Sequence, residues 1–330
     1  MQCPKEVRYN ADRKGGIALN SKIIFMGTPQ IAATVLEHLL EAKANVVLAV
    51  TQPDKKVGRK GTVQACEVKK LAQEHGIPVF QPTKIRTDYQ PILDAKADLV
   101  ITCAYGQIVP QAVLEAPKHG CVNLHGSLLP KYRGAAPIQR ALWQGERVSG
   151  MSLMRMEVGM DTGGVAAQAT LNLEPNETTT TLFDKMGHLA GNLIVDNLDA
   201  LLAGELEFIA QDHDQATYAA KISKEEEEID LSKDDEQIDR QIRALAQVPG
   251  GYVSTSIGKL KLLSVRYEPG QTPGIGVFGK QGKKQFVMGG HKGLFLLDEV
   301  QPEGKNPMKS ADFINGKGRS LLGQKVGDYK

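Results

Sequence analysis

The sequence contains no apolar run that approaches the roughly 18 residues of a membrane span, which excludes an integral membrane protein. Its first 20 residues also lack the apolar stretch of a secretory signal peptide. They contain both Asp and Glu, which argues against an organellar transit peptide. We therefore expect a cytoplasmic protein that binds no membrane, and we interpret residues 1–20 as an extension that is disordered or lies along the surface.

Cysteine is scarce: the chain has four cysteines among its 330 residues, and they lie far apart. Cys3, Cys66, Cys103 and Cys121 form no C-x-x-C pair, so the pattern typical of a structural zinc site is missing. The spacing favours a reduced intracellular protein. We expect no bound metal.

Two glycine-rich phosphate-binding loops are also missing. A dinucleotide site needs G-x-G-x-x-G between a strand and a helix, but only Gly27 stands there, followed by Thr28 and Pro29. No G-x-x-x-x-G-K-[ST] loop occurs anywhere in the chain. These absences disfavour a nicotinamide-dependent dehydrogenase and an ATPase.

The first part of the chain alternates apolar strands with helical segments. Strands that are apolar on both faces are typical of a parallel sheet that helices cover on both sides. The sequence therefore predicts a doubly wound, Rossmann-like α/β domain, which binds ligands beyond the carboxyl ends of its strands. The predicted strands are residues 22–27, 45–51, 77–82, 98–106 and 120–125. The predicted helices are a first one that Thr28 caps and Pro29 begins, then 66–76, 88–96, 111–117 and one from about 137.

The second half of the chain changes character after two more strands, 151–158 and 165–173, and a helix over 179–203. A polar stretch follows, then a helix over 233–246 and short strands with frequent Gly and Pro, which predict a small OB-like β-barrel. We thus expect a catalytic domain over 21–204, a linker over 205–223 and a barrel domain over 224–330. Residues 252–330 carry 13 basic and six acidic residues, a charge of about +7 that suits a polyanion or a solvated basic surface.

Asn123 and His125 stand at the end of a predicted strand. Side chains alternate along a strand, so both point to one face, where the carboxyl end of a parallel strand opens onto a ligand site. An amide can donate to a developing oxyanion, and an imidazole can donate or shuttle a proton near neutral pH. Asp161, in the glycine-flanked turn VGMDTGG, could hold that imidazole protonated. The alternatives are a strand-end Asn, a core His and an ordinary turn Asp.

A set of motifs resembles one family over residues 21 to near the end. They are FMGTP, TQPDKKVGR, NLHGSLLPKYRGAAPIQRAL, VGMDTGG and YAAKISKEEEEID. The chain resembles the 10-formyltetrahydrofolate-dependent formyltransferases, and within them the methionyl-tRNA formyltransferases. One segment departs from the pattern: LAQVPGGYV, residues 245–253, lacks the family's aromatic residues there, and Tyr252 could replace part of them. That departure bears on packing rather than on the catalytic assignment.

The resemblance implies transfer of a formyl group from N10 of the folate to the α-amino group of methionine on initiator tRNA. It assigns catalysis to Asn123, His125 and Asp161, by direct attack of the amine. It also implies a folate-binding turn, Ser127, Leu128, Leu129 and Pro130, and a pterin-lining loop, Ala104, Tyr105, Gly106 and Gln107. We expect a monomer.

The loop over residues 51–61 carries four cations that the resemblance assigns to the acceptor stem of tRNA: Lys55, Lys56, Arg59 and Lys60. Arg59 matches the family's key arginine. Clustered cations in a loop can contribute salt-sensitive affinity for a polyanion. A solvated surface loop is the alternative.

Two other functions compete with this one. A related folate enzyme could hydrolyse the formyl donor or modify an amino-sugar nucleotide, but such enzymes lack the basic terminal domain joined by a YAAKISKEE-type segment. A noncatalytic RNA-binding protein on a former enzyme scaffold is the other, and intact Asn123, His125 and Asp161 count against it.

Overall fold

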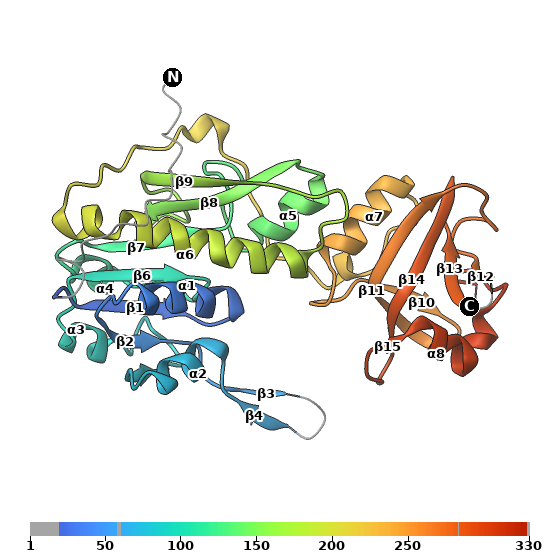
Figure 1. Ribbon diagram of the computed structural model, residues 1–330, viewed down its shortest axis with the longest axis horizontal. Helices are drawn as coiled ribbons and strands as arrows, with labels where there is room; N and C mark the ends of the chain where they lie inside the picture. Colours follow the sequence, from blue (N-terminus) through green and yellow to red (C-terminus); the bar gives the residue numbers. More distant parts are fainter. Residues whose placement is uncertain (1–19, 58–60, 283, 329–330) are drawn as a thin grey trace. The chain divides into compact units, whose positions relative to one another are not determined.

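The computed structural model describes residues 20–57, 61–282 and 284–328 (Figure 1). The described chain divides into two compact units. The first contains the residues up to Pro137 together with Val148–Asn172 and Phe183–Ala219, and the second contains Ile138–Arg147, Leu173–Leu182 and the residues from Ala220 onward. Two short segments from the middle of the chain therefore pack with the C-terminal part, which sequence order alone does not indicate. The predicted domain boundaries stay predictions.

The first unit is built on a seven-stranded sheet with the strand order β5-β2-β1-β6-β7-β8-β9. Its strands are β1 Ile23–Gly27, β2 Val46–Val50, β5 Val79–Phe80, β6 Leu99–Cys103, β7 Cys121–His125, β8 Val148–Arg155 and β9 Val165–Asn172. The five strands from β5 to β7 are parallel, so the predicted Rossmann-like fold class is confirmed. β8 instead runs antiparallel to both of its neighbours, β7 and β9, so β9 points in the same direction as the five parallel strands.

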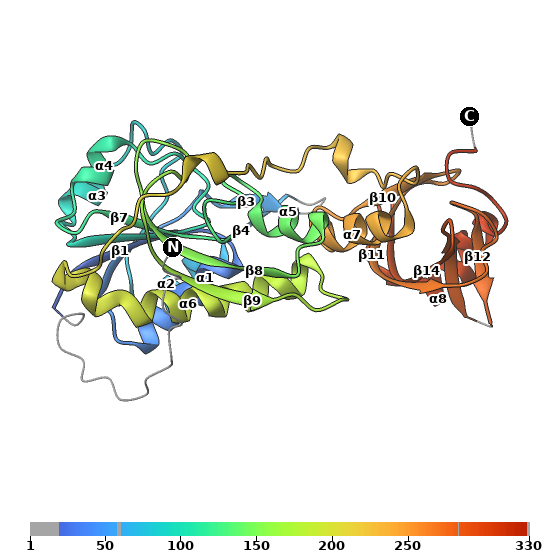
Figure 2. The ribbon, with the colours of Figure 1, turned by 90° about the horizontal axis from the view of Figure 1, so that it is seen from above.

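Helices cover both faces of this sheet. Figure 2 shows α1 and α6 on one side and α3 and α4 on the other. The helices of this unit are α1 Gln30–Glu41, α2 Glu67–Glu74, α3 Gln90–Asp94, α4 Gln111–Glu115 and most of α6 Thr179–Ala203. Helix α5 Pro137–Gln144 belongs to the second unit from Ile138 onward. The prediction that Thr28 caps the first helix is wrong. Pro29 is the N-cap, because the Thr28 hydroxyl donates to Tyr105 O (3.4 Å) and accepts from Gln52 N (3.2 Å) instead.

Side chains along β1 alternate between the two faces of the sheet, and both faces are buried. Ile24 and Met26 belong to an apolar cluster that includes Ile92 of α3 and Val113 of α4. Residue 27 is glycine because an added Cβ would lie 2.6 Å from Ala32 Cβ and 2.8 Å from Cys103 O. The close approach of α1 to the end of β6 therefore needs a residue without a side chain, and this end of the sheet is where the predicted site residues gather.

The second unit is an antiparallel sheet with the order β10-β11-β14-β13-β12, and β15 pairs with β14. This confirms a separate C-terminal β domain. Its elements are β10 Tyr252–Thr255, β11 Gly258–Pro269, β12 Phe278–Gln281, β13 Gln285–Gly289, β14 Gly293–Pro302, β15 Met308–Lys309, α7 Asp235–Ala244 and α8 Ser310–Asn315. Phe286 forms its core, stacked on Phe278 at 5.3 Å and edge-on to Phe313 at 5.6 Å between ring centroids. In the departing segment 245–253, Leu245 joins this core and Tyr252 is buried, with Lys259 Nζ 4.0 Å from its ring centroid.

No helix among the described residues is long and apolar enough to cross a membrane. The described part of the chain also contains no group of three or more His, Cys, Asp or Glu side chains that could hold a metal ion.

Candidate active site

Asn123 lies in β7, next to Thr102 of β6 in the parallel register. Its Oδ1 accepts a hydrogen bond of 2.8 Å from the hydroxyl of Thr102, which is buried. The Asn123 oxygen thus lies on the Thr102 side and the NH₂ group points the other way; the Thr102 hydroxyl also lies 3.1 Å from Val122 O. Thr102 is a residue that the motif analysis missed, and a threonine inside an apolar strand was the signal that could have indicated it.

His125 ends β7, with only 5% of its surface exposed. Its Nε2 lies 2.9 Å from Tyr132 O. Because a carbonyl oxygen only accepts, Nε2 carries a proton, and Nδ1 is the nitrogen that can gain or lose one. Nδ1 lies 3.7 Å from Asp161 Oδ2, close enough for an ion pair when the ring is protonated. The imidazole is therefore held between a backbone carbonyl and a carboxylate.

Asp161 lies in the loop that joins β8 to β9. Its Oδ2 accepts a hydrogen bond of 2.8 Å from Gly134 N, which belongs to the loop after β7. The two loops therefore meet at the carboxylate that faces His125. The predicted meeting of His125 with Asp161 is what the structure describes.

Backbone strain gathers around these loops. Ala104 after β6, Tyr132 after β7 and Asp161 after β8 have φ values of 48°, 59° and 51°, in the left-handed region that residues other than glycine seldom adopt. Such conformations cost on the order of 1–3 kcal/mol each and persist where surrounding contacts enforce them, often at functional sites. These loops thus have the character of a site rather than of an ordinary set of turns.

Two polar side chains, one from β8 and one from β9, hold the backbone of the turn Ser127–Pro130. Ser152 Oγ of β8 donates to Ser127 O (2.6 Å) and accepts from Leu129 N (3.1 Å). Gln168 Nε2 of β9 donates to Leu129 O (3.0 Å). Ser127 and Leu129 are buried, whereas Leu128 and Pro130 are half-buried. Ser152 and Gln168 were missed; a serine between the apolar residues of MSLMRM was the available signal.

The loop 104–107 presents its residues unequally. Ala104 and Gly106 are exposed, but the Tyr105 ring packs into the apolar core, and burial raises its pKa to about 12. The Tyr105 hydroxyl has no hydrogen-bond partner among the described residues. Gln107 Oε1 accepts from Ile85 N (2.9 Å), which ties the loop to the segment after β5. If the loop lines a pterin site, Tyr105 supports that site from the apolar core rather than through a polar contact.

Two cysteines lie near the site in β6 and β7. Burial raises the pKa of the Cys103 and Cys121 thiols to about 12. Neither thiol is ionised near neutral pH, so neither can act as a nucleophile. The arrangement suits attack by a substrate's own nucleophile.

The predicted tRNA-binding loop begins as a hairpin. β3 Lys55–Val57 pairs antiparallel with β4 Thr62–Gln64, whereas the sequence was interpreted as an irregular loop. Lys55 is exposed; Arg59 and Lys60 lie outside the described residues, as does the side chain of Lys56. The base of the hairpin is anchored by Asp54, which accepts from Lys69 Nζ (2.6 Å) and Gln81 Nε2 (2.9 Å). The hydrogen bond from Gln81 and then that from Lys69 lower the pKa of Asp54.

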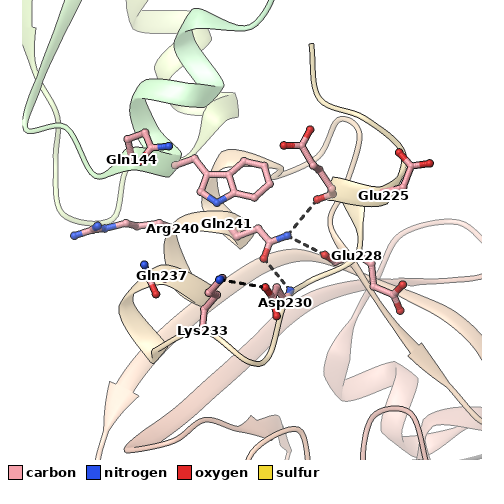
Figure 3. A pocket seen from close by; sticks show the side chains of 10 residues that line it. Gln144, Glu225, Glu228, Asp230, Lys233, Gln237, Arg240 and Gln241 are labelled. Carbon is pink, nitrogen blue, oxygen red and sulfur yellow. Dashed lines mark hydrogen bonds and ion pairs between the residues drawn. The ribbon is translucent and has the colours of Figure 1, made fainter. Parts of the chain in front are cut away.

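A separate pocket of about 440 Å³ lies within the second unit (Figure 3). Its carboxylates include Glu225, Glu228 and Asp230, and Gln241 lies at its floor. The pocket is predominantly acidic, so it is poorly suited to the phosphate or carboxylate groups of a polyanion. None of the predicted site residues lines it.

Comparison with known proteins agrees with the geometry. Residues 21–198 match the family model described as formyl transferase, and residues 221–318 match that of the formyl transferase C-terminal domain. Among solved structures, HypX from Aquifex aeolicus superposes with a TM-score of 0.68 at 15% identity; the match covers 94% of this chain and 51% of HypX, so the chain spans about half of that protein. The N-formyltransferase from Helicobacter canadensis, in complex with folinic acid and dTDP-3-aminofucose, gives a TM-score of 0.64 at 20% identity over 84% of this chain and 98% of that one.

These two structures share the fold. A closer relative in sequence is the methionyl-tRNA formyltransferase of Listeria innocua serovar 6a, which is 40% identical over 306 residues, 91% of this chain and 97% of the relative. The chain belongs to the formyltransferase family and, within it, to the methionyl-tRNA formyltransferases.

Proposed function

We propose that this chain transfers the formyl group of 10-formyltetrahydrofolate to the α-amino group of methionine on initiator methionyl-tRNA. The observation that carries the proposal is the pairing of His125 with Asp161 at 3.7 Å, on the same strand end as Asn123. Family membership supports the reaction class. The complex of the Helicobacter canadensis relative with folinic acid supports a folate as the donor.

In the proposed reaction the free amine attacks the formyl carbon and forms a tetrahedral intermediate. The carbonyl oxygen becomes an oxyanion, to which the Asn123 NH₂ and the Nδ1–H of protonated His125 donate, because Nε2–H is already bound to Tyr132 O. One such donor is typically worth about 3–4 kcal/mol of transition-state stabilisation. Asn123 suits this role because its Oδ1 lies on the Thr102 side, 2.8 Å from that hydroxyl, so its NH₂ group points away from this contact.

The second half of the reaction moves a proton. The bond between the formyl carbon and N10 breaks, and N10 takes up a proton while the attacking nitrogen loses one. Asp161 supports this exchange because its carboxylate faces His125 Nδ1 at 3.7 Å, close enough to pair with the ring once Nδ1 carries a proton. A water molecule between the two nitrogens would complete the transfer.

Binding of the two substrates is assigned to separate surfaces of the fold. The turn Ser127–Pro130 and the loop 104–107 would contact the folate. The hairpin that carries Lys55, Lys56, Arg59 and Lys60 would contact the tRNA acceptor stem, with the basic C-terminal domain supplying further phosphate contacts.

The test is formyl transfer by the purified chain with a radiolabelled formyl donor and charged initiator tRNA. We expect label in formylmethionyl-tRNA and its loss when the tRNA is uncharged. Release of labelled formate without transfer would identify a hydrolase, and transfer only to an amino-sugar nucleotide would identify the other rival. Either result would overturn the proposal.

The tRNA surface is tested with Arg59→Ala. We expect a higher KM for tRNA at physiological salt and a weaker dependence of that KM on salt, because one phosphate contact is lost. An unchanged KM would remove Arg59 from the site.

A further inference from the structure

Residues 208–219, called the strap below, run over the loops of the candidate active site within the first unit. The strap begins with a bridge to β9, in which Val165 N donates to Ile209 O (2.8 Å) and Ile209 N donates to Val165 O (3.0 Å). It continues through the 3₁₀ turn His213–Gln215 and ends at Ala219, which is buried. The polar composition of this segment predicted a linker, yet its contacts are those of an integral part of the site.

Gln211 is the most connected side chain of the strap, and only 9% of its surface is exposed. Its Nε2 donates to Asp161 O (2.9 Å) and to Gly163 O (2.7 Å). Its Oε1 accepts from Arg133 Nε (3.1 Å) and Nη2 (2.7 Å). One amide thus joins the loop after β7 to the loop after β8.

Arg133 fixes the direction of this amide. A guanidinium only donates, so it selects the oxygen of Gln211 and sends the NH₂ group to the two carbonyls. Arg133 is 2% exposed, and its Nη1 lies 3.1 Å from Nδ1 of His213, which must accept. The Gln211 amide therefore has both of its protons and its oxygen in use.

The other end of the strap holds the Tyr132–Arg133 segment by its backbone. Tyr132 N donates to Thr217 Oγ1 (2.8 Å), Arg133 N donates to Thr217 O (2.8 Å), and Ala219 N donates to Arg133 O (2.7 Å). Residue 134 is glycine at φ 119°, and an added Cβ would lie 2.8 Å from Ala219 O. The strap and the loop are in direct backbone contact.

These two sets of contacts hold the two residues that contact the His125 ring. Gln211 holds the backbone of Asp161, whose carboxylate faces Nδ1, and Thr217 holds Tyr132, whose carbonyl accepts from Nε2. Both partner residues have positive φ, a conformation that needs support from its surroundings. We propose that the strap orients the imidazole of His125, with Gln211 and Thr217 as positioning residues for formyl transfer. This inference rests on the proposed function.

The principal test is Gln211→Glu, which keeps the size of the side chain and the acceptor for Arg133 but removes the NH₂ group. A carboxylate would repel the carbonyls of Asp161 and Gly163, so we expect kcat to fall about 10-fold with KM values for folate and tRNA unchanged, as for a displaced catalytic group. Thr217→Val keeps the shape and removes the acceptor for Tyr132 N; we expect a fall of about 3-fold. Gln73→Glu, at an exposed glutamine of α2 in the same unit and outside the strap, is the matched control and should keep the wild-type kcat.

A second experiment distinguishes positioning of the His125 ring from a merely structural role of the strap. Gln211→Glu and Thr217→Val are repeated in a His125→Ala background, and single-turnover rates are measured. If the strap acts through the ring, neither substitution lowers the residual rate further. Equal losses in both backgrounds, or full kcat in Gln211→Glu, would overturn the inference. If Gln211→Glu does not fold, as judged by thermal unfolding, Gln211→Asn takes its place with the same expectations.

The outcome for the strap is distinct from the outcome for the proposed function. A wild-type chain that transfers no formyl group overturns the function. A wild-type chain that does, together with Gln211→Glu and Thr217→Val variants that match it, overturns only the role of the strap.

Discussion

Two buried glutamines, one in each unit, hold irregular segments in the same way. Gln211 is 9% exposed and Gln241 is 4% exposed. In the second unit, Gln241 Oε1 accepts from Asp230 N (2.9 Å), and its Nε2 donates to Glu226 O (3.1 Å) and Glu228 O (2.9 Å) (Figure 3). Each amide therefore satisfies two backbone carbonyls and accepts from protein N–H groups.

The two glutamines differ in the segment whose backbone carbonyls each one binds. The carbonyls that Gln211 holds belong to the loop of Asp161, beside His125. Those that Gln241 holds belong to the acidic turn around Glu225–Glu227, on the wall of the pocket in Figure 3. A buried glutamine thus fixes the loop of Asp161 in one unit and the segment 226–230 that precedes helix α7 in the other. Removing them should affect turnover in the first case and stability in the second.

The largest effect should follow removal of the charge beside His125. Asp161→Asn keeps an acceptor for Gly134 N but loses the negative charge that faces His125 Nδ1 at 3.7 Å. We expect kcat to fall about 10³-fold, within the range for a group in general acid–base catalysis, with an unchanged melting temperature. Steady-state formyl transfer and calorimetry measure the two quantities.

The control for that variant is Asp184→Asn, an exposed carboxylate on α6 of the same unit. It should match wild type in both measurements. Near-normal turnover in Asp161→Asn would mean that this carboxylate serves only to accept from Gly134.

Gln241→Leu should have the next largest effect, on stability alone. It leaves Asp230 N and the carbonyls of Glu226 and Glu228 without their amide partner, so we expect a loss of about 3 kcal/mol in the free energy of unfolding of the second unit. Urea titration followed by the fluorescence of Trp143, which lines the same pocket, would measure it. Gln237→Leu, an exposed glutamine on the same helix, is the control and should cost little.

The rate of formyl transfer distinguishes the role of Gln211 from that of Gln241. At temperatures where Gln241→Leu is folded, its rate of formyl transfer at saturating tRNA should equal that of wild type. A rate loss as large as that of Gln211→Glu would remove the distinction between the two units.

The elements that the sequence predicted correctly are those with a strong apolar period. The β1 and β6 strands are wholly buried, and their unbroken apolar runs indicated a covered parallel sheet. The β3–β4 hairpin was missed because its strands pair only with each other and residues Thr62–Gln64 are all exposed, so no burial pattern marks them. Exposed strands carry little of the signal that such predictions use.

Site residues divide in the same way. Asn123, His125 and Asp161 could be named because their motifs are local and specific. Gln211 could not, because its burial depends on Arg133, 78 residues earlier in the chain. A polar segment is correctly expected to be a loop, but its sequence does not say which buried guanidinium it will meet.

A smaller effect is expected at Asp235, which anchors the first turn of α7. This buried carboxylate accepts from His291 N (2.6 Å), Lys292 N (2.7 Å) and the Tyr267 hydroxyl (2.9 Å). Burial opposes its ionisation, but these donors outweigh it and hold the pKa of Asp235 below its ordinary value. Asp235→Asn presents an NH₂ group to backbone donors, so we expect a loss of about 2 kcal/mol at pH 7.

The lowered pKa of Asp235 determines how the stability difference between wild type and Asp235→Asn changes with pH. A carboxyl with a lowered pKa in the folded state stabilises the fold above its unfolded pKa, and this contribution disappears as the pH falls through the folded value. The difference between wild type and Asp235→Asn should therefore be constant above about pH 5 and shrink below pH 4. A difference that stays constant down to pH 2 would show that the charge of Asp235 contributes nothing.

The smallest effect should come from the ion pair beside the Gln241 amide. Arg140 Nη1 and Nη2 donate to Glu226 Oε1 (2.6 Å) and Oε2 (2.8 Å), a bidentate contact in which the two side chains are 17% and 35% exposed. The hydrogen bond from Arg140 lowers the pKa of Glu226. Because solvent screens the pair, Arg140→Met should cost only about 1 kcal/mol, measured by urea titration at pH 7.

That difference should narrow in 1 M salt and below about pH 4.5, where Glu226 becomes protonated in the unfolded chain and then in the folded one. The Gln241 contacts are neutral and should respond to neither condition. If the costs of Arg140→Met and Gln241→Leu fell together with salt, the stabilisation attributed to the buried amide would belong to the ion pair. The second unit would then be held at this point by charge rather than by satisfied backbone groups.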